Sequence, residues 1–212
     1  MEQVRRRAQK EELRRPAIEL LNTHKISLQG HFDLGNGQHS TQYRNPHAIF
    51  DTPSHVWQLA QCLIDLSIDA NEADVIAGPT FGGAILAYVM AGLLSGQSKP
   101  GSEVKRYVPL KETKDGYVIR EHYRQFVTGR RIWLVDDVCR TGQTLSLCAA
   151  ALEEHGGRVI ATSVILQNMQ GMLIRDPSLK DVHLEHIQTF SASSIPVGDC
   201  PQCLVGVPIT KF

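Results

Sequence analysis

The segment Arg131–Thr144 constrains the fold of this chain more than any other stretch. Its apolar run, Ile132–Val135, ends abruptly in two adjacent carboxylates, Asp136 and Asp137, and a short Thr/Gly turn follows. Beyond the turn, apolar residues recur with the spacing of a helix, at Leu145, Cys148, Ala149 and Leu152. A continuous apolar run is typical of a strand buried on both faces of a parallel sheet. The segment therefore predicts a central strand, a turn and a helix, with the acidic pair at the strand end where ligands of open parallel sheets bind.

The rest of the chain repeats this alternation of strands and helices. Strands are expected at Val75–Ala77, Lys105–Val108 and Val159–Leu166. Residues 1–23 are expected to be helical, with Pro16 starting a second short helix, and Asn36-Gly37 is typical of a hairpin turn. A charged loop is expected over 111–124 and an irregular tail from residue 180 onward. We predict a single α/β domain over residues 1–212, with a parallel sheet and right-handed crossovers.

Composition restricts the partners and the compartment. Lys plus Arg equals Asp plus Glu at 22 each, so nothing indicates a general nucleic-acid surface. The first residues lack the apolar centre of a signal peptide, and no apolar run approaches membrane-spanning length. The five cysteines are odd in number and scattered, which suits a reducing cytoplasm. We therefore expect a cytoplasmic protein that binds neither nucleic acid nor membrane.

The chemistry expected at the acidic strand end is that of a phosphorylated sugar. Backbone amides at a helix start attract anions, and Thr141, Gly142 and Thr144 add hydroxyls and a close backbone approach, so phosphate is the natural guest. Carboxylates would repel that phosphate, so Asp136 and Asp137 must serve another part of the ligand. Sugar hydroxyls can donate to carboxylates, and Mg²⁺ takes oxygen ligands. The plainer alternative is an ordinary strand-turn-helix connection with surface aspartates.

With these residues in place, the segment resembles the phosphoribosyl pyrophosphate signature of type I phosphoribosyltransferases. The resemblance implies a central parallel sheet flanked by helices, with a core over about 51–179 and a small hood over about 20–50 and 180–212. It also implies that the 5-phosphate is bound by Val138, Cys139, Arg140, Thr141, Gly142, Gln143 and Thr144. Arg140 and Gln143 depart from the small residues common there. Because amide groups do not depend on the side chain, we expect phosphate binding to survive.

Two further glycine-containing segments match the same family. Gly30–Tyr43 resembles the hairpin characteristic of orotate phosphoribosyltransferases, part of the hood over the base, which implies base-side roles for Phe32, Asn36 and Gly37. Gly78–Gly83 corresponds to the loop that holds pyrophosphate, which implies that Pro79, Thr80, Phe81, Gly82 and Gly83 bind substrate. That loop often carries an unusual peptide geometry, which would fall at Thr80-Phe81. A surface hairpin and a tight turn are the plainer alternatives.

A lysine-bearing segment, starting at Lys111, resembles the family's Lys-Glu-x-Lys loop. In the family the second lysine, here Lys114, closes over the active site of the neighbouring subunit, which implies a homodimer with shared sites. Cations that arrive on closure stabilise the charge of departing pyrophosphate, so Lys111 and Lys114 are the expected catalytic cations. Leu110 and Gly116 stand where the family often has Arg and His, and the candidates to compensate are Arg120, His122 and Arg124. The alternative is an ordinary charged surface loop.

The base site departs from the family at Asn168. Orotate enzymes usually carry Asp-Arg after the last strand, whereas this chain reads Gln167-Asn168. An arginine pairs bidentately with a carboxylate such as that of orotate, and Asn lacks the charge. We keep Asn168 as a base-side residue, with Arg44, Arg175 or a hood amide as the group that replaces the arginine.

The histidines and the C-terminal cysteines are interpreted as structural. Cys200-Pro201-Gln202-Cys203 resembles the tail of one bacterial branch of the family. A single CxxC is weak evidence for zinc, since a structural site needs four ligands. His183 and His186 are the candidates to complete such a site, but a reduced pair of packing thiols is the favoured interpretation. The recurrence of histidine every eight residues, at His31, His39, His47 and His55, is treated as chance.

Together these features predict phosphoribosyl transfer from phosphoribosyl pyrophosphate to a nucleobase, with orotate as the leading candidate. Asp136 and Asp137 would hold the ribose hydroxyls and stabilise positive charge at C1. Mg²⁺ is the expected cofactor, carried by the substrate rather than by a side chain of the protein. The alternatives are an enzyme using another base and a non-enzymatic regulator that binds the donor.

Overall fold

The structure is a computed structural model that describes residues 2–24, 26–34, 37–96, 104–170 and 179–211. Its centre is a six-stranded sheet with the strand order β5-β4-β3-β6-β7-β8. The strands are β3 Val75–Pro79, β4 Arg106–Thr113, β5 Gly116–Ile119, β6 Arg131–Cys139, β7 Arg158–Asn168 and β8 Leu184–Phe190. All neighbouring pairs are parallel except β4 and β5. The predicted α/β fold with a central parallel sheet is confirmed, and each predicted strand is present and longer than expected.

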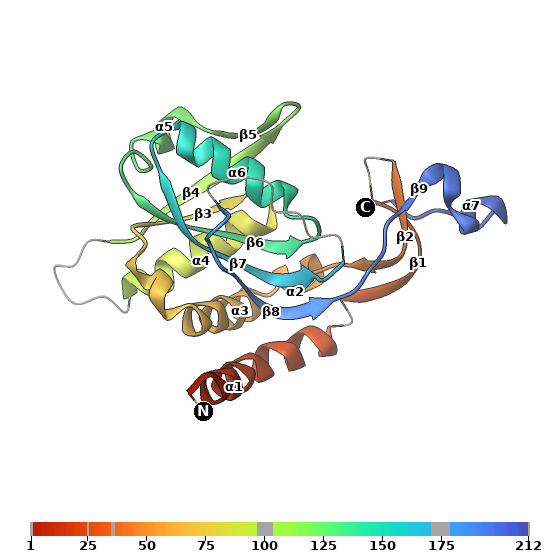
Figure 1. Cartoon of the computed structure of the whole chain (residues 1–212), viewed down its shortest axis with the longest axis horizontal. Coiled ribbons are helices and arrows are strands. Elements are labelled where there is room, and N and C mark those ends of the chain that lie inside the picture. The colour runs from red at the N-terminus through yellow and green to blue at the C-terminus, as the bar shows by residue number, and fades with distance from the viewer. Residues whose placement is uncertain (1, 25, 35–36, 97–103, 171–178, 212) are drawn as a thin grey trace.

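Helices cover both faces of this sheet, as Figure 1 shows. On one face lie α3 Pro53–Leu66 and α4 Gly82–Gly96, and on the other lies α6 Gln143–Glu154. The central strand β6 divides its side chains between the two layers. Trp133 and Val135 pack with α3 and α4, while Ile132 and Leu134 pack with α6. All four are fully buried, which is why this strand reads as an unbroken apolar run.

The N-terminal segment forms one helix, α1 Glu2–Thr23, with Pro16 inside it. The expectation that Pro16 starts a second helix is therefore wrong. Ala17 and Leu21 are buried against the layer that contains α3, and this packing keeps the residues after the proline helical. Short helical turns complete the chain at α2 His47–Phe50, η1 Ile68–Glu72, α5 Glu121–Arg124, η3 Val197–Asp199 and α7 Pro201–Leu204.

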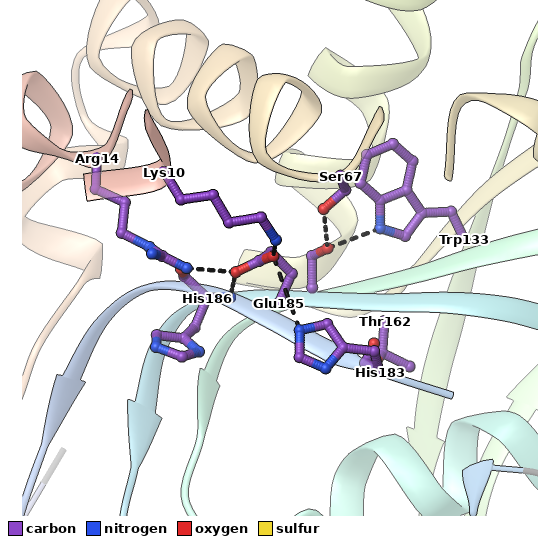
Figure 2. Close-up of polar contacts among 9 residues, drawn as sticks. Lys10, Arg14, Ser67, Trp133, Thr162, His183, Glu185 and His186 are labelled. Carbon is purple, nitrogen blue, oxygen red and sulfur yellow. Dashed lines mark hydrogen bonds and ion pairs between the residues drawn. The ribbon is translucent and has the colours of Figure 1, made fainter. Parts of the chain in front are cut away.

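A buried carboxylate ties α1 to the sheet. Glu185 on β8 accepts hydrogen bonds from both Lys10 and Arg14 of α1, as Figure 2 shows. Arg14 also donates from Nε to the backbone oxygen of His186 at 2.9 Å. The side chain of Glu185 is only 5% exposed, so this helix is anchored by charge as well as by apolar contact.

A second, three-stranded antiparallel sheet stands apart from the core (Figure 1) and is called the hood sheet below. It consists of β1 Ser27–Asp33, β2 Gln38–Arg44 and β9 Ile195–Pro196. The predicted hairpin is confirmed: β1 pairs with β2, and Gly37 adopts the left-handed φ of 74° that such turns require. Asn36 lies outside the described residues.

Two predictions about irregular segments are wrong. The tail from residue 180 includes β8, an edge strand of the six-stranded sheet, so the predicted hood range 180–212 contains part of the core. The polar residues Glu185 and His186 interrupt the apolar pattern of β8, so the sequence does not indicate a strand there. The expected loop over 111–124 holds instead the end of β4, the strand β5 and the helix α5.

Within the described residues, no helix combines the length and the apolar character that crossing a membrane requires.

Candidate active site

A cleft of about 1220 Å³ lies between the carboxyl ends of β6 and β7 and the hood sheet. The segment after β6 and the start of α6 form its floor, and β2 with residues 190–194 forms the opposite wall. The predicted phosphate residues line it together: Val138, Cys139, Arg140, Thr141, Gly142, Gln143 and Thr144. The cleft thus lies at the strand ends where the sequence predicts a ligand.

The floor of the cleft is the start of α6. Gly142 precedes the helix with a left-handed φ of 83°, a conformation that a side chain would strain. The Gln143 amide donates to Thr141 Oγ1 at 3.3 Å. At the helix start, the first backbone amides have no partner within the helix and favour an anion. This arrangement suits a phosphate group.

Asp136 and Asp137 sit beside this floor in different environments. Asp136 is 7% exposed, and its Oδ1 accepts the Asp137 amide at 2.8 Å. Burial, and then the neighbouring charge of Asp137, raise the pKa of Asp136 well above its usual value. Asp137 accepts the Val138 amide at 2.7 Å, and its Oδ2 lies 3.7 Å from His47 Nε2. A buried carboxyl of raised pKa is stabilised in its charged form when a cation or a donor hydroxyl arrives.

The glycine loop after β3 approaches the acidic pair closely. A methyl group on Gly82 would lie 2.2 Å from Asp137 Oδ2, and one on Gly83 would lie 2.9 Å from Asp136 Oδ1. Only glycine therefore fits at Gly82. The Thr80-Phe81 peptide bond is cis, at the position where the family resemblance implies an unusual peptide geometry. The structure does not place Pro79, Thr80, Phe81, Gly82 or Gly83 in the lining of the cleft. Gly83 approaches Asp136, which lines it, and Gly82 approaches Asp137, which does not.

A stack of three side chains joins the floor to the hood sheet. The Arg140 guanidinium lies over the Tyr43 ring, 5.1 Å from its centre, and Tyr43 packs on Phe32 with ring centres 5.6 Å apart. Burial lowers the pKa of Arg140. Phe32 is buried and supports Tyr43 rather than lining the cleft. Gly37 lies in the turn, also outside the lining. Tyr43 was not among the predicted site residues, although it ends the hairpin motif.

The wall opposite the floor presents an arginine with an unsatisfied donor. Arg44 lines the cleft, its guanidinium lies 5.4 Å from the centre of the Phe190 ring, and its buried Nε has no hydrogen-bond partner among the described residues. Burial lowers the pKa of Arg44. An unpaired buried guanidinium nitrogen is costly unless a ligand satisfies it. Arg175, the other arginine considered, lies outside the described residues.

Asn168 lines the same wall, but its amide is occupied. Nδ2 donates to the backbone oxygens of Gln170 and Ala192, at 2.8 and 3.0 Å. Oδ1 accepts the amides of the same two residues, both at 3.2 Å. Asn168 therefore ties the end of β7 to the 192 segment and has no free donor for a base.

Lys111 and Lys114 are exposed on the β4–β5 hairpin and do not line the cleft of their own chain. Side chains alternate along a strand, so Glu112 and its partner Tyr117 face the cleft while Lys111 faces away. Burial, followed by the nearby Cys148 and Glu112, raises the pKa of Tyr117 to about 12. Glu112 and Tyr117 were not predicted as cleft residues, because only the register of the hairpin reveals them.

Comparison with known proteins agrees with this geometry. Residues 47–195 match the phosphoribosyl transferase domain family, and the chain therefore belongs to that family. It is an enzyme of the pentosyltransferase class. Orotate phosphoribosyltransferase of Thermoanaerobacter sp. (strain X514) is 26% identical over 194 residues, covering 92% of this chain and 94% of the relative.

Two solved structures share the type I phosphoribosyltransferase fold. Orotate phosphoribosyltransferase from Aeropyrum pernix aligns with a TM-score of 0.62 at 20% identity, over 81% of this chain and 92% of that one. The Mycobacterium tuberculosis orotate phosphoribosyltransferase in complex with 5-phospho-α-D-ribosyl 1-diphosphate aligns with a TM-score of 0.55 at 15% identity, over 85% and 89% of the two chains.

Proposed function

We propose that the protein transfers the phosphoribosyl group of phosphoribosyl pyrophosphate to orotate, giving orotidine 5'-monophosphate and pyrophosphate. The observation that carries the proposal is the convergence of three features on one cleft: the α6 start, Asp136 with Asp137 beside it, and Arg44. The names of the relatives support orotate as the base. The five cysteines, all unpaired, agree with a reducing cytoplasm as the compartment.

The proposed roles follow from the positions of the residues. The 5-phosphate binds to the amides and hydroxyls of Thr141–Thr144. Asp136 and Asp137 accept the ribose hydroxyls. As a ring nitrogen of the base attacks C1, the bond from C1 to pyrophosphate breaks and positive charge develops at C1. The buried carboxylate of Asp136 stabilises that charge more strongly than water would.

Mg²⁺ is the proposed cofactor, and the donor set near the pyrophosphate loop fits it. Carboxylate oxygens are the ligands that Mg²⁺ takes, and those of Asp136 and Asp137 lie next to Gly82 and Gly83. When bound with the donor, the ion would neutralise part of the pyrophosphate charge.

For the base, Arg44 is the proposed partner of the orotate carboxylate. It supplies the charge that Asn168 lacks, it lines the cleft, and its buried Nε has no hydrogen-bond partner among the described residues. An Arg44→Gln variant should raise KM for orotate by about tenfold to a hundredfold, while KM for the sugar donor changes little. If both KM values change equally, Arg44 does not read the base.

A homodimer with shared active sites is the proposed assembly. Lys114 lies outside the cleft of its own chain, which suits a cation that serves a neighbouring subunit. Two impaired variants provide the test: Lys114→Ala, and Asp136→Asn with Asp137→Asn. Mixing them after subunit exchange should restore part of the activity, because some hybrid dimers hold one intact site. A mixture that stays inactive in a verified dimer would exclude sharing.

The deciding assay is the release of pyrophosphate from phosphoribosyl pyrophosphate and Mg²⁺ with orotate, beside a panel of other bases. Release with orotate supports the proposal in full. A second candidate is an enzyme for another base, which the occupied amide of Asn168 favours, and release with that base alone would select it. Binding of phosphoribosyl pyrophosphate without release of pyrophosphate in the presence of any base would support the third candidate, a non-enzymatic regulator that binds the donor.

A further inference from the structure

Four metal-ligating side chains meet in the hood sheet, far from the acidic pair in sequence. His31 of β1, His39 of β2, Cys200 and Cys203 place one ligand atom each within 4.8 Å of one another. Three of the four are buried, and Cys203 is exposed. His31 and His39, two of the four histidines that recur every eight residues, thus meet across β1 and β2. His183 and His186, the ligands first considered, lie instead beside Glu185 (Figure 2).

The distances within this cluster match a tetrahedral zinc site. His31 Nε2 lies 2.9 Å from His39 Nδ1, 3.4 Å from Cys200 Sγ and 3.6 Å from Cys203 Sγ. Cys203 Sγ lies 3.3 Å from His39 Nδ1. Zn–N bonds of about 2.0–2.1 Å and Zn–S bonds of about 2.3 Å separate tetrahedral ligand atoms by roughly 3.3–3.8 Å. These four distances lie within a few tenths of an ångström of that range, and the widest pair of ligand atoms, up to 4.8 Å apart, would close by about 1 Å around an ion.

The orientation of His31 also suits a metal ligand. Its Nδ1 lies 2.9 Å from the backbone oxygen of Val207, which can only accept a hydrogen bond. The proton of the neutral ring therefore sits on Nδ1, and Nε2 turns its lone pair towards the other three ligands. A backbone carbonyl that fixes the second nitrogen in this way is the usual partner of a metal-binding histidine.

The C-terminal tail, residues 191–211, is held by polar contacts rather than by apolar packing. Cys200 is the only buried residue of this segment, all of which the structure describes, and Leu204 and Val205 are 81% and 76% exposed. Its main-chain contacts with β1, β2 and the turn between them are the pairing of β9 with β2, the Val197 amide to the Gly37 oxygen at 3.1 Å, and two bonds between Thr210 and β1 at 2.8 and 3.0 Å. Small units that cannot bury enough apolar surface commonly rely on a metal for stability.

We propose that His31, His39, Cys200 and Cys203 bind one structural zinc ion that fastens the C-terminal tail to the hood sheet. Two thiolates and two imidazoles in tetrahedral arrangement are the ligand set of structural zinc, and no position is left for a substrate or a catalytic water. The thiols lose their protons to solvent as the ion binds, and no electron is transferred. The ion holds β2, which carries Tyr43 and Arg44, and the tail, which carries Ser193 and Ser194, on the wall of the cleft.

The test measures metal content and needs no assay of activity. Untagged full-length protein from zinc-supplied cells should contain one zinc per chain by elemental analysis. Cys203→Ser should lose it, and because this position is exposed the substitution disturbs no core packing. Cys62→Ser is the matched control, because this thiol lies in α3 and donates to the Leu13 oxygen, as a hydroxyl also can; it should keep the zinc.

Cobalt provides a second measurement on the unaltered sequence. After chelation under reducing conditions, the wild-type protein should take up one Co²⁺ and show the intense visible and charge-transfer bands of tetrahedral thiolate coordination. Proteases should cut within 191–211 faster in the chelated protein than in the zinc form. Absence of zinc together with no cobalt spectrum would overturn the proposal, as would a Cys200–Cys203 disulfide in freshly isolated protein.

Discussion

The two walls of the cleft are built by different forces. The floor rests on β6, whose Ile132, Trp133 and Leu134 are fully buried between two layers of helices. The opposite wall belongs to the hood sheet and the C-terminal tail, where hydrogen bonds and ligating side chains replace apolar packing. Burial of apolar area is the larger stabilising force. The floor of the cleft is thus stabilised by buried apolar area, whereas the opposite wall depends on a few polar contacts.

The largest expected difference between the two regions is in the free energy of unfolding when a leucine of each is replaced by alanine. Leu63→Ala removes a fully buried side chain of α3 and should lower the free energy of unfolding by about 2–5 kcal/mol. Leu204→Ala, in the tail, removes a side chain that is 81% exposed and should change it by less than about 0.5 kcal/mol. Urea unfolding of both variants measures the contrast. A loss of several kcal/mol for Leu204→Ala would show that the tail buries it against another surface.

Asp136→Asn should lower activity and raise stability. Loss of the carboxylate should reduce kcat by about 10²–10³-fold. Because burial raises the pKa of Asp136 in the folded protein, the free protein loses stability as pH rises above the unfolded value of 3.8. The neutral amide lacks this cost and can still accept the Asp137 amide, so the variant should gain about 1 kcal/mol at neutral pH.

Asp74→Asn is the control with the opposite sign. Its carboxylate accepts hydrogen bonds from Arg131, and that pairing, led by the side-chain bond, lowers the pKa of Asp74. Replacing it should destabilise the protein slightly and leave kcat unchanged, since Asp74 does not line the cleft. Thermal unfolding beside steady-state kinetics separates the two variants. Equal stability changes for Asp136→Asn and Asp74→Asn would contradict the pKa argument.

The sequence predicts the six-stranded sheet and the floor of the cleft better than it predicts the hood sheet and the C-terminal tail. The apolar run at Ile132–Val135, bounded by two aspartates and a Thr/Gly turn, is typical of a buried strand, so the strand and its acidic end follow from the order of residues. Asn168 reads as a base contact, yet four backbone hydrogen bonds occupy its amide. His31 and Cys200 are 169 positions apart, so no local pattern joins them. A polar site whose residues come from distant segments can be recognised only from the folded structure of the hood sheet.

A buried ion pair between α1 and β8 tests whether charge also contributes to the core. Glu185 is buried, and burial alone would raise its pKa, but hydrogen bonds and charges from Lys10 and Arg14 outweigh burial and lower it. Glu185→Gln should cost about 1–3 kcal/mol at neutral pH, towards the lower value because the Lys10 side chain is 38% exposed. Glu2→Gln, which breaks an exposed pair with Arg6 on the same helix, should cost less than about 0.5 kcal/mol.

The pH dependence of the Glu185→Gln effect has a definite sign. A carboxyl whose folded pKa is lowered stabilises the protein above its unfolded pKa of 4.5, and that contribution is lost as pH falls below 4.5 through the folded pKa. The difference in unfolding free energy between wild type and Glu185→Gln should therefore be constant above about pH 5.5 and shrink under acid. A difference that stays constant down to pH 3 would mean that the shape of the side chain, and not its charge, attaches α1 to β8.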